Sequence, residues 1–232
     1  MPVWQAASLG FGQALAGSGQ QVEAIKVMED FLNRYKKSGY VIEVNLSLSR
    51  CYAENGKKEI DNFLNKNKKS SQVTAVMVMG HSYDEIVMMG IIKESNPQET
   101  KADFEKSYKE AKLNFDKAFA AMSKVRQYAR DPEMMVKADV EMAAIQVLMG
   151  DKMGALASYQ RILLFSDPSN ARVRPHVEEA FESSLPLFRE TARFADLLEA
   201  CETYLKQFPQ GQFVEKARQA RNEAKAKLAA GK

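Results

Sequence analysis

Histidines are the first side chains of this 232-residue sequence that could do chemistry, and there are two of them. His81 stands in a methionine-rich apolar stretch. A metal site on a helix would need a second ligand four residues away, where Met77 and Glu85 stand, and a single carboxylate does not complete a site. We therefore predict a structural role for His81, and we expect His176 near an exposed helix start.

The two cysteines, Cys51 and Cys201, lie far apart in the sequence and within apolar helical patterns. Neither has a second cysteine or a histidine at the spacing of a metal site. A free cysteine in an apolar pattern behaves as a small hydrophobic residue. We therefore predict two buried free thiols, which are compatible with an oxidising or a reducing compartment.

Sequence signatures of catalysis are absent. The chain contains no glycine-rich phosphate loop, no nucleophile elbow, no HExxH motif and no paired carboxylates with a plausible cleft. The sequence therefore predicts a protein that is not an enzyme and holds no metal or cofactor. A helical enzyme or small-molecule carrier that uses the methionine-rich core around His81 is the alternative, and a pocket beside His81 would favour it.

Charge is nearly balanced, with 33 lysines and arginines against 30 acidic residues and a net charge of +3. A dedicated nucleic-acid-binding domain is usually more basic, so we expect no nucleic-acid partner. Two local basic patches stand out: Lys57, Lys58, Lys66, Lys68 and Lys69, and Lys216, Arg218, Arg221, Lys225 and Lys227. We interpret them as solvated faces, with an acidic partner or membrane headgroups as the alternative.

Methionines form a further cluster at Met77, Met79, Met88 and Met89. Because methionine repacks easily, such a cluster suits either core filling or an adaptable binding surface. We predict core filling.

No stretch reaches the ~18 apolar residues needed to span a bilayer. The first residues carry no basic side chain before their apolar part, which makes them a poor signal peptide. We expect a soluble mature domain, or a fragment of a longer chain whose targeting sequence is absent here.

The best-formed structural stretch runs from Pro132 to Pro168. Asp131 is a good N-cap, and Pro132 suits the first turn of a helix. Apolar residues then recur at three- and four-residue steps until Gly150, and a second apolar stripe follows up to Asp167. This pattern predicts a helix–turn–helix hairpin. The spacing of its two prolines is close to the ~34-residue period of the tetratricopeptide repeat.

The rest of the chain shows similar helical patterns and no useful β-alternation. We expect one domain over 1–232, with helix pairs at 3–37, 40–66, 72–130, 132–168 and 173–208 and a polar capping helix at 212–230. Within it, Asn55–Gly56 predicts a helix stop, so that 40–53 and 58–66 would be separate helices. The stretch 72–93 predicts one buried helix. Pro186 predicts a kinked or split helix, and Gly10 and Gly12 suit a close helix crossing. A single helical bundle is the competing architecture.

Small residues and aromatic residues at fixed places in these hairpins resemble the tetratricopeptide-repeat (TPR) family. The family pattern asks for a small residue late in the first helix, then an alanine, an aromatic residue and a closing proline in the second. The residues that carry the resemblance are Ala143, Ala155, Tyr159 and Pro168 in one hairpin, Gly12, Leu15, Ala24 and Phe31 in the first, and Phe188, Tyr204 and Pro209 in the fifth. The resemblance implies an all-α, right-handed solenoid of about five antiparallel helix pairs with a C-terminal cap.

Two helix endings, Phe31–Tyr35 and Tyr204–Gly211, also look like those of bacterial cell-envelope repeat proteins. This group includes outer-membrane assembly lipoproteins, although their lipid-anchoring cysteine is missing here. The resemblance implies a periplasmic or envelope location if a signal sequence precedes this chain. It also raises an alternative role, a structural repeat module of a longer envelope or secretion protein.

The first helix of each pair lines the concave face in such solenoids, where repeat proteins generally bind. We therefore expect a scaffold that binds a helical or extended segment of another protein through this face. Helical register predicts ten partner-binding residues: Glu43, Arg50, Glu54, Lys137, Val140, Ala144, Val147, Glu179, Glu182 and Arg189.

Overall fold

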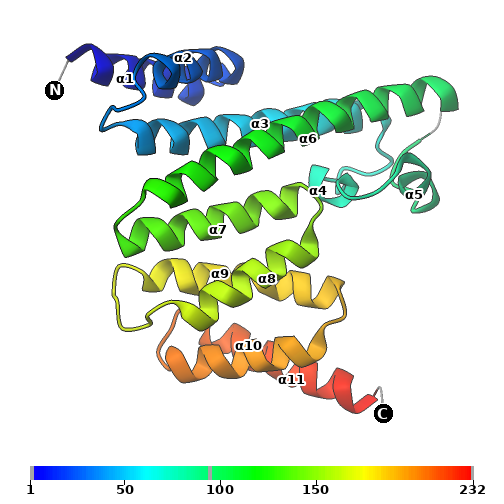
Figure 1. Ribbon diagram of the computed structural model, residues 1–232. Helices are drawn as coiled ribbons and strands as arrows, with labels where there is room; N and C mark the ends of the chain where they lie inside the picture. Colours follow the sequence, from blue (N-terminus) through cyan, green and yellow to red (C-terminus); the bar gives the residue numbers. More distant parts are fainter. Residues whose placement is uncertain (1–2, 94–95, 231–232) are drawn as a thin grey trace. The chain divides into compact units, whose positions relative to one another are not determined.

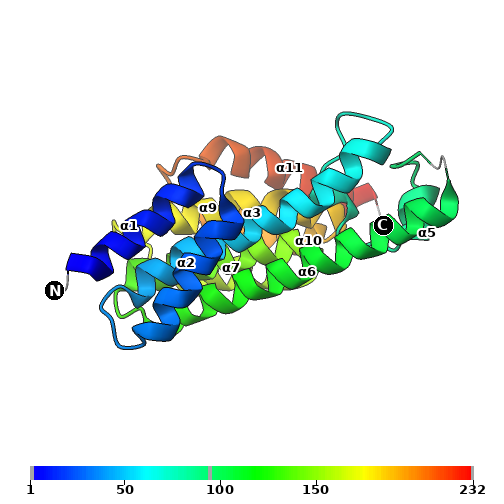
Figure 2. The ribbon, with the colours of Figure 1, turned by 90° about the horizontal axis from the view of Figure 1, so that it is seen from above.

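The computed structural model describes residues 3–93 and 96–230, and in these ranges it is all-helical with no strands. Eleven helices of the described chain pack in neighbouring pairs (Figures 1 and 2). The predicted all-α class is therefore confirmed. The helices form two compact units, Met1–Tyr128 with Val147–Gly150, and Ala129–Gln146 with Asp151–Lys232.

The first unit begins with a hairpin of α1 (Val3–Gly17) and α2 (Gln21–Arg34). Gly12 lets the two helices approach, because a Cβ placed there would lie 3.1 Å from Met28 Cγ. Gly10 faces open space, with nothing within 4 Å of such a Cβ. The expected close crossing is confirmed for Gly12 and wrong for Gly10.

Helix α3 (Val41–Asn67) is one continuous helix of 27 residues. The predicted stop at Asn55–Gly56, and with it the separate helices 40–53 and 58–66, is wrong. Gly56 lies instead where α3 crosses α6 (Pro97–Tyr128), and a Cβ there would stand 2.7 Å from Phe115 Cε1. A glycine inside a helix costs about 0.5–1 kcal/mol relative to alanine, and the close packing of the fully buried Phe115 ring offsets this cost.

The connection between α3 and α6 contains two short helices, α4 (Ala75–Val78) and α5 (Tyr83–Met88). The predicted single helix over 72–93 is therefore wrong, and so is its predicted pairing with 98–130, because α6 packs along α3 (Figure 1). Gly80 interrupts the helix with a φ of 87°. Ser82 then caps α5 in a capping box with Glu85, which starts a new helix in another direction.

The second unit follows the predicted helices closely. It contains α7 (Pro132–Leu148, of which Val147 and Leu148 belong to the first unit), α8 (Lys152–Phe165), α9 (Arg174–Glu190), α10 (Phe194–Gln207) and α11 (Val214–Ala230). Helix α9 continues through Pro186, so the proline does not split it.

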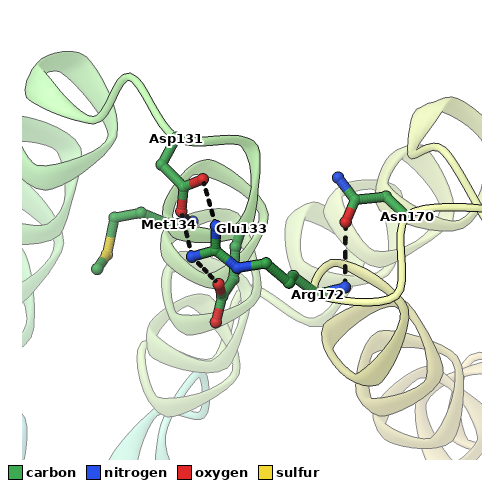
Figure 3. A network of polar contacts seen from close by, with 5 residues as sticks. All are labelled: Asp131, Glu133, Met134, Asn170 and Arg172. Atoms are coloured by element: carbon green, nitrogen blue, oxygen red, sulfur yellow. Dashed lines mark hydrogen bonds and ion pairs between the residues drawn. The ribbon is translucent and has the colours of Figure 1, made fainter.

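An arginine ties the α8–α9 loop to the start of α7 (Figure 3). Arg172 binds both oxygens of Asp131 at 3.4 Å and Glu133 at 2.5 Å. Asp131 also accepts a hydrogen bond from the Met134 backbone N–H, which makes it the N-cap that the sequence predicted. The start of α9 is thereby positioned relative to the start of α7.

A register of 34 residues recurs between alternate helices in both units. In the first unit, Gln13 of α1 donates to Ser47 of α3. In the second, Glu182 and Arg189 of α9 pair with Lys216 and Glu223 of α11. Each of these contacts joins residues 34 positions apart. Contacting residues are therefore 34 positions apart in these two pairs of alternate helices, α1 with α3 and α9 with α11.

Candidate functional site

Three predicted partner-binding residues of the first unit share one face of α3. Glu43, Arg50 and Glu54 are exposed and follow one another at helical spacing, with Ser47 between them. Residues at such three- and four-residue steps lie above one another on a helix. The structure thus brings these three residues together, as the helical register predicted.

Arg50 and Glu54 line a cavity of about 300 Å³ that α1, the start of α2 and α3 form together. The other lining residues are Gln13, Ala16, Gln21, Ser47 and Cys51. Gln13 Nε2 donates to Ser47 Oγ at 3.2 Å across the cavity wall. The cavity therefore offers amide, hydroxyl, guanidinium and carboxylate groups within one small space.

The chemistry of this cavity suits binding. Glu54 accepts a hydrogen bond from Lys57 Nζ at 3.0 Å, and Arg50 supplies a guanidinium that can bind a carboxylate with two hydrogen bonds. Cys51 is a buried free thiol, as predicted. Burial raises its pKa, which disfavours the thiolate that a nucleophile needs. Cys201 is also buried and free, and burial raises its pKa to about 12.

In the second unit, the predicted residues of α9 already contact side chains of opposite charge or a histidine. Glu182 pairs with Lys216, and Arg189 Nε donates to Glu223 Oε2 at 2.9 Å. Glu179 is exposed and lies 3.7 Å from His176 Nδ1. A ligand on this face would therefore have to compete with two ion pairs between α9 and α11.

The predicted residues of α7 are less accessible. Lys137 and Ala144 are half-buried, and Val140 is 4% exposed, so the Val140 side chain is not available to a partner. Val147 is half-buried and belongs to the first unit. Among the ten predicted residues, Arg50 and Glu54 combine exposure with a cavity most clearly.

A second cavity, of about 430 Å³, lies beside His81. The loop before α5, the first turn of α5 and one face of α6 line it, with Gly80, His81, Ser82, Tyr83, Asp84, Lys101, Phe104, Glu105 and Tyr108. Lys101 lies 3.8 Å from Asp84 and 5.8 Å from the centre of the Tyr83 ring. His81 is half-buried, so it borders open space at this cavity.

A buried carboxylate network in the second unit was not anticipated. Glu178 accepts hydrogen bonds from Arg174 Nε, Tyr204 Oη and the Gln212 backbone N–H, each at 2.7 Å. Burial alone would raise the pKa of Glu178, but these hydrogen bonds outweigh burial and lower it. The sequence contains one sign of this network, because Glu178 is a charged residue that follows the inward-facing Val177 on the same helix. Through Glu178, the network fixes α9, α10 and the start of α11 relative to one another.

The sequence matches no known protein-family model and no curated protein. Across residues 3–93 and 96–230, no three His, Cys, Asp or Glu side chains gather as a metal site would require. Within the same part of the chain, no helix has the length and apolar character needed to cross a membrane. The two cavities, beside Arg50 and beside His81, are therefore the features of the described chain from which a function can be inferred.

Proposed function

We propose that this protein is a non-catalytic scaffold of the TPR type, a right-handed α-solenoid that binds a segment of another protein. The observation that carries the proposal is the polar cavity around Arg50 and Glu54, on the helix face where the repeat register predicted binding. A polar cavity of this kind fixes the orientation of a ligand through a few placed hydrogen-bonding groups.

The register between alternate helices supports the repeat assignment. Contacts between residues 34 positions apart occur in both units, and the TPR period is ~34 residues. The small and aromatic residues that carried the resemblance are buried as that pattern requires, with Ala24, Ala143, Ala155 and Tyr159 all at 3% exposure or less. They let paired helices approach closely, which is their role in such repeats.

The ligand we propose is an extended or helical segment that carries both an acidic and a neutral polar side chain. An acidic group would meet Arg50, and amide or hydroxyl groups would meet Gln13, Gln21 and Ser47. Because Glu43 and Glu54 flank Arg50 on the same helix, a strongly acidic segment would be repelled. A mixed-charge segment fits this pattern best.

A peptide array made from the proteins of the source organism tests this function, and calorimetry then measures the affinity of each peptide that binds. Arg50→Glu should weaken binding by about tenfold or more, because loss of a charge-assisted hydrogen bond costs about 1.5–3 kcal/mol. Lys58→Glu makes the same charge change at an exposed position on α3 outside the cavity and serves as the matched control. If Arg50→Glu and Lys137→Glu, singly and together, leave every interaction intact, the proposal fails.

The cavity beside His81 favours a second candidate, the binding of a small molecule. Its aromatic and charged lining would suit a ligand that carries both an apolar ring and a polar group. A fragment screen by protein-observed NMR would test this candidate. Chemical-shift changes confined to 80–84 and 101–108, and lost in Tyr108→Ala, would support it, and the absence of any such change would remove it.

A further inference from the structure

The segment between α3 and α6 is closed at its base by a short antiparallel contact. Lys68 and Ile92 form an isolated β-bridge. Lys69 N–H donates to Ile91 O at 3.0 Å, and Lys93 N–H donates to Asn67 O at 2.7 Å. The contact brings the lysines that end α3 beside the residues that follow α5, although Lys68 and Ile92 are 24 positions apart in the sequence.

Four lysines at this base have no acidic partner among the residues that the structure describes. Lys66, Lys69 and Lys93 are exposed and make no ion pair in that part of the chain, and Lys68 Nζ bonds only the neutral Asn65 Oδ1, at 3.0 Å. Lys69 and Lys93 each directly follow a residue of the bridge, so the bridge holds both lysines at the base of the segment.

Among the described residues of this segment, the two acidic side chains are engaged elsewhere: Asp84 pairs with Lys101, and Glu85 caps α5 through Ser82. Three of the basic residues of α11 differ, because Lys216, Arg218 and Lys225 each pair with a glutamate. The base of the segment therefore carries positive charge that the described residues do not neutralise.

Two methionines protrude beside these lysines. Met88 and Met89, at the end of α5, are 79% and 55% exposed. Lys69 Nζ lies 4.0 Å from the place of a Cβ on the adjacent Gly90. Core filling, which the sequence suggested for this cluster, holds for Met79 and is wrong for Met77, Met88 and Met89. An exposed apolar pair and a group of lysines thus form one surface.

We propose that this basic methionine surface, Lys66, Lys68, Lys69, Lys93, Met88 and Met89, binds anionic lipid headgroups at a membrane surface. Lysines near an anionic bilayer each add to binding, and apolar side chains next to them can enter the boundary between headgroups and acyl chains. A protruding pair of flexible side chains needs no matching pocket, which favours a lipid surface over a folded protein partner.

Co-sedimentation of the full chain with vesicles tests the proposal. Vesicles of phosphatidylcholine with about a third phosphatidylserine should bind the protein, and vesicles of phosphatidylcholine alone should not. Lys69→Glu with Lys93→Glu should weaken the partition coefficient at least about 25-fold, because each lysine near the surface contributes about fivefold. Met88→Ser with Met89→Ser should weaken the partition coefficient about tenfold, and equally at high salt, because the lost contribution is the burial of apolar surface.

Lys216→Glu with Lys225→Glu makes the same charge change on α11 and should have little effect. Because all substituted side chains of the surface are exposed or half-buried, circular dichroism should show intact helices in each variant. Equal binding to neutral and anionic vesicles, or an equal loss in the α11 variant, would overturn the proposal. Binding to polyglutamate without binding to vesicles would also overturn it, in favour of an acidic protein partner. Arg50→Glu should leave vesicle binding unchanged, which separates this inference from the proposed scaffold function.

Discussion

The two compact units hold their helices together by different means. In the first, α3 and α6 cross where the ring of Phe115 packs on Gly56, a contact between an apolar side chain and bare backbone. In the second, the buried carboxylate of Glu178 accepts hydrogen bonds from Arg174 of α9, from Tyr204 of α10 and from the Gln212 backbone just before α11. The first contact depends on shape, and the second depends on complete hydrogen bonding.

Both units nevertheless keep the same 34-residue register between alternate helices. Helix lengths do not set this register, since α3 has 27 residues and α9 has 17. These contacts between alternate helices therefore keep the same spacing whatever the helix lengths, and each unit stabilises its helix pairs in its own way. An apolar crossing leaves the ends of long helices free to carry an added segment, as α3 and α6 do with α4 and α5.

The largest expected effect is at the apolar crossing. Phe115→Ala should lower the free energy of unfolding by about 3–5 kcal/mol, the usual cost of removing a fully buried phenylalanine. Urea denaturation measures this loss, and hydrogen exchange should show it in α3 and α6. Leu113→Ala, at a 56% exposed position of the same helix, should change the free energy by less than about 0.5 kcal/mol.

Gly56→Ala sharpens the test, because its sign should depend on Phe115. Alone, the added Cβ would stand 2.7 Å from Phe115 Cε1, and such overpacking costs about 1–3 kcal/mol. In the Phe115→Ala background the same change should be stabilising, since alanine favours the helix and the clash is gone. An equal effect in both backgrounds would contradict the proposed role of the crossing.

The polar network of the second unit should give the next largest effect. Glu178→Gln removes the charge that holds Arg174, and a hydrogen bond to a charged group contributes about 1.5–3 kcal/mol. Thermal and urea unfolding should both report a loss of about 2–3 kcal/mol. Glu182→Gln, on the same helix but in a surface ion pair with Lys216, should cost less than about 1 kcal/mol.

This network also predicts a pH dependence that the apolar crossing lacks. The pKa of Glu178 is lowered in the folded protein. Its stabilisation is therefore complete above the unfolded pKa of about 4.3 and is lost as the pH falls through the folded pKa. The difference in unfolding free energy between wild type and Glu178→Gln should stay constant from pH 7 to about 5 and shrink below about pH 4. A difference that grows at low pH would exclude this role.

A close turn in the second unit gives a third test. Gly211 lies against Tyr204, so that a Cβ there would overlap Tyr204 Oη and stand 2.9 Å from Phe208 Cβ. Gly211→Ala should therefore cost about 1–3 kcal/mol in urea denaturation. Part of that cost should disappear in a Tyr204→Phe background, where the overlapped oxygen is absent. Purely additive effects would show that the two residues do not interact.

The sequence predicted the second unit better than the first, for a physical reason. Helices α7 to α11 begin and end at local signals, such as Asp131, Pro132 and Gly150. Gly56 also looked like a local stop, but its meaning depends on Phe115, 59 positions further along the chain, and no local pattern shows that contact. The break at Gly80 did have a local signal, because Ser82 and Glu85 have the spacing of a capping box. The hydrophobic pattern across 72–93 nevertheless predicted one continuous helix through this capping box.

The candidate site shows the same division. Arg50 and Glu54 could be predicted because helical register alone places them on one face of α3. Their cavity also needs Gln13 and Gln21, whose position depends on how the α1–α2 hairpin packs. The basic methionine surface needs the bridge between Lys68 and Ile92, which brings two separate sequence clusters together.

The smallest expected effect contrasts two glycines of α1. Gly10→Ala should raise the free energy of unfolding by about 0.5–1 kcal/mol, because alanine favours a helix and nothing lies within 4 Å of the new Cβ. Gly12→Ala has the same helix preference, but its Cβ would stand 3.1 Å from Met28 Cγ and force that side chain to move. Urea denaturation of both variants should therefore give stabilisation for the first and a smaller gain or a loss for the second. If Gly12→Ala proves the more stable of the two, the close approach of α1 and α2 at Gly12 does not limit their packing.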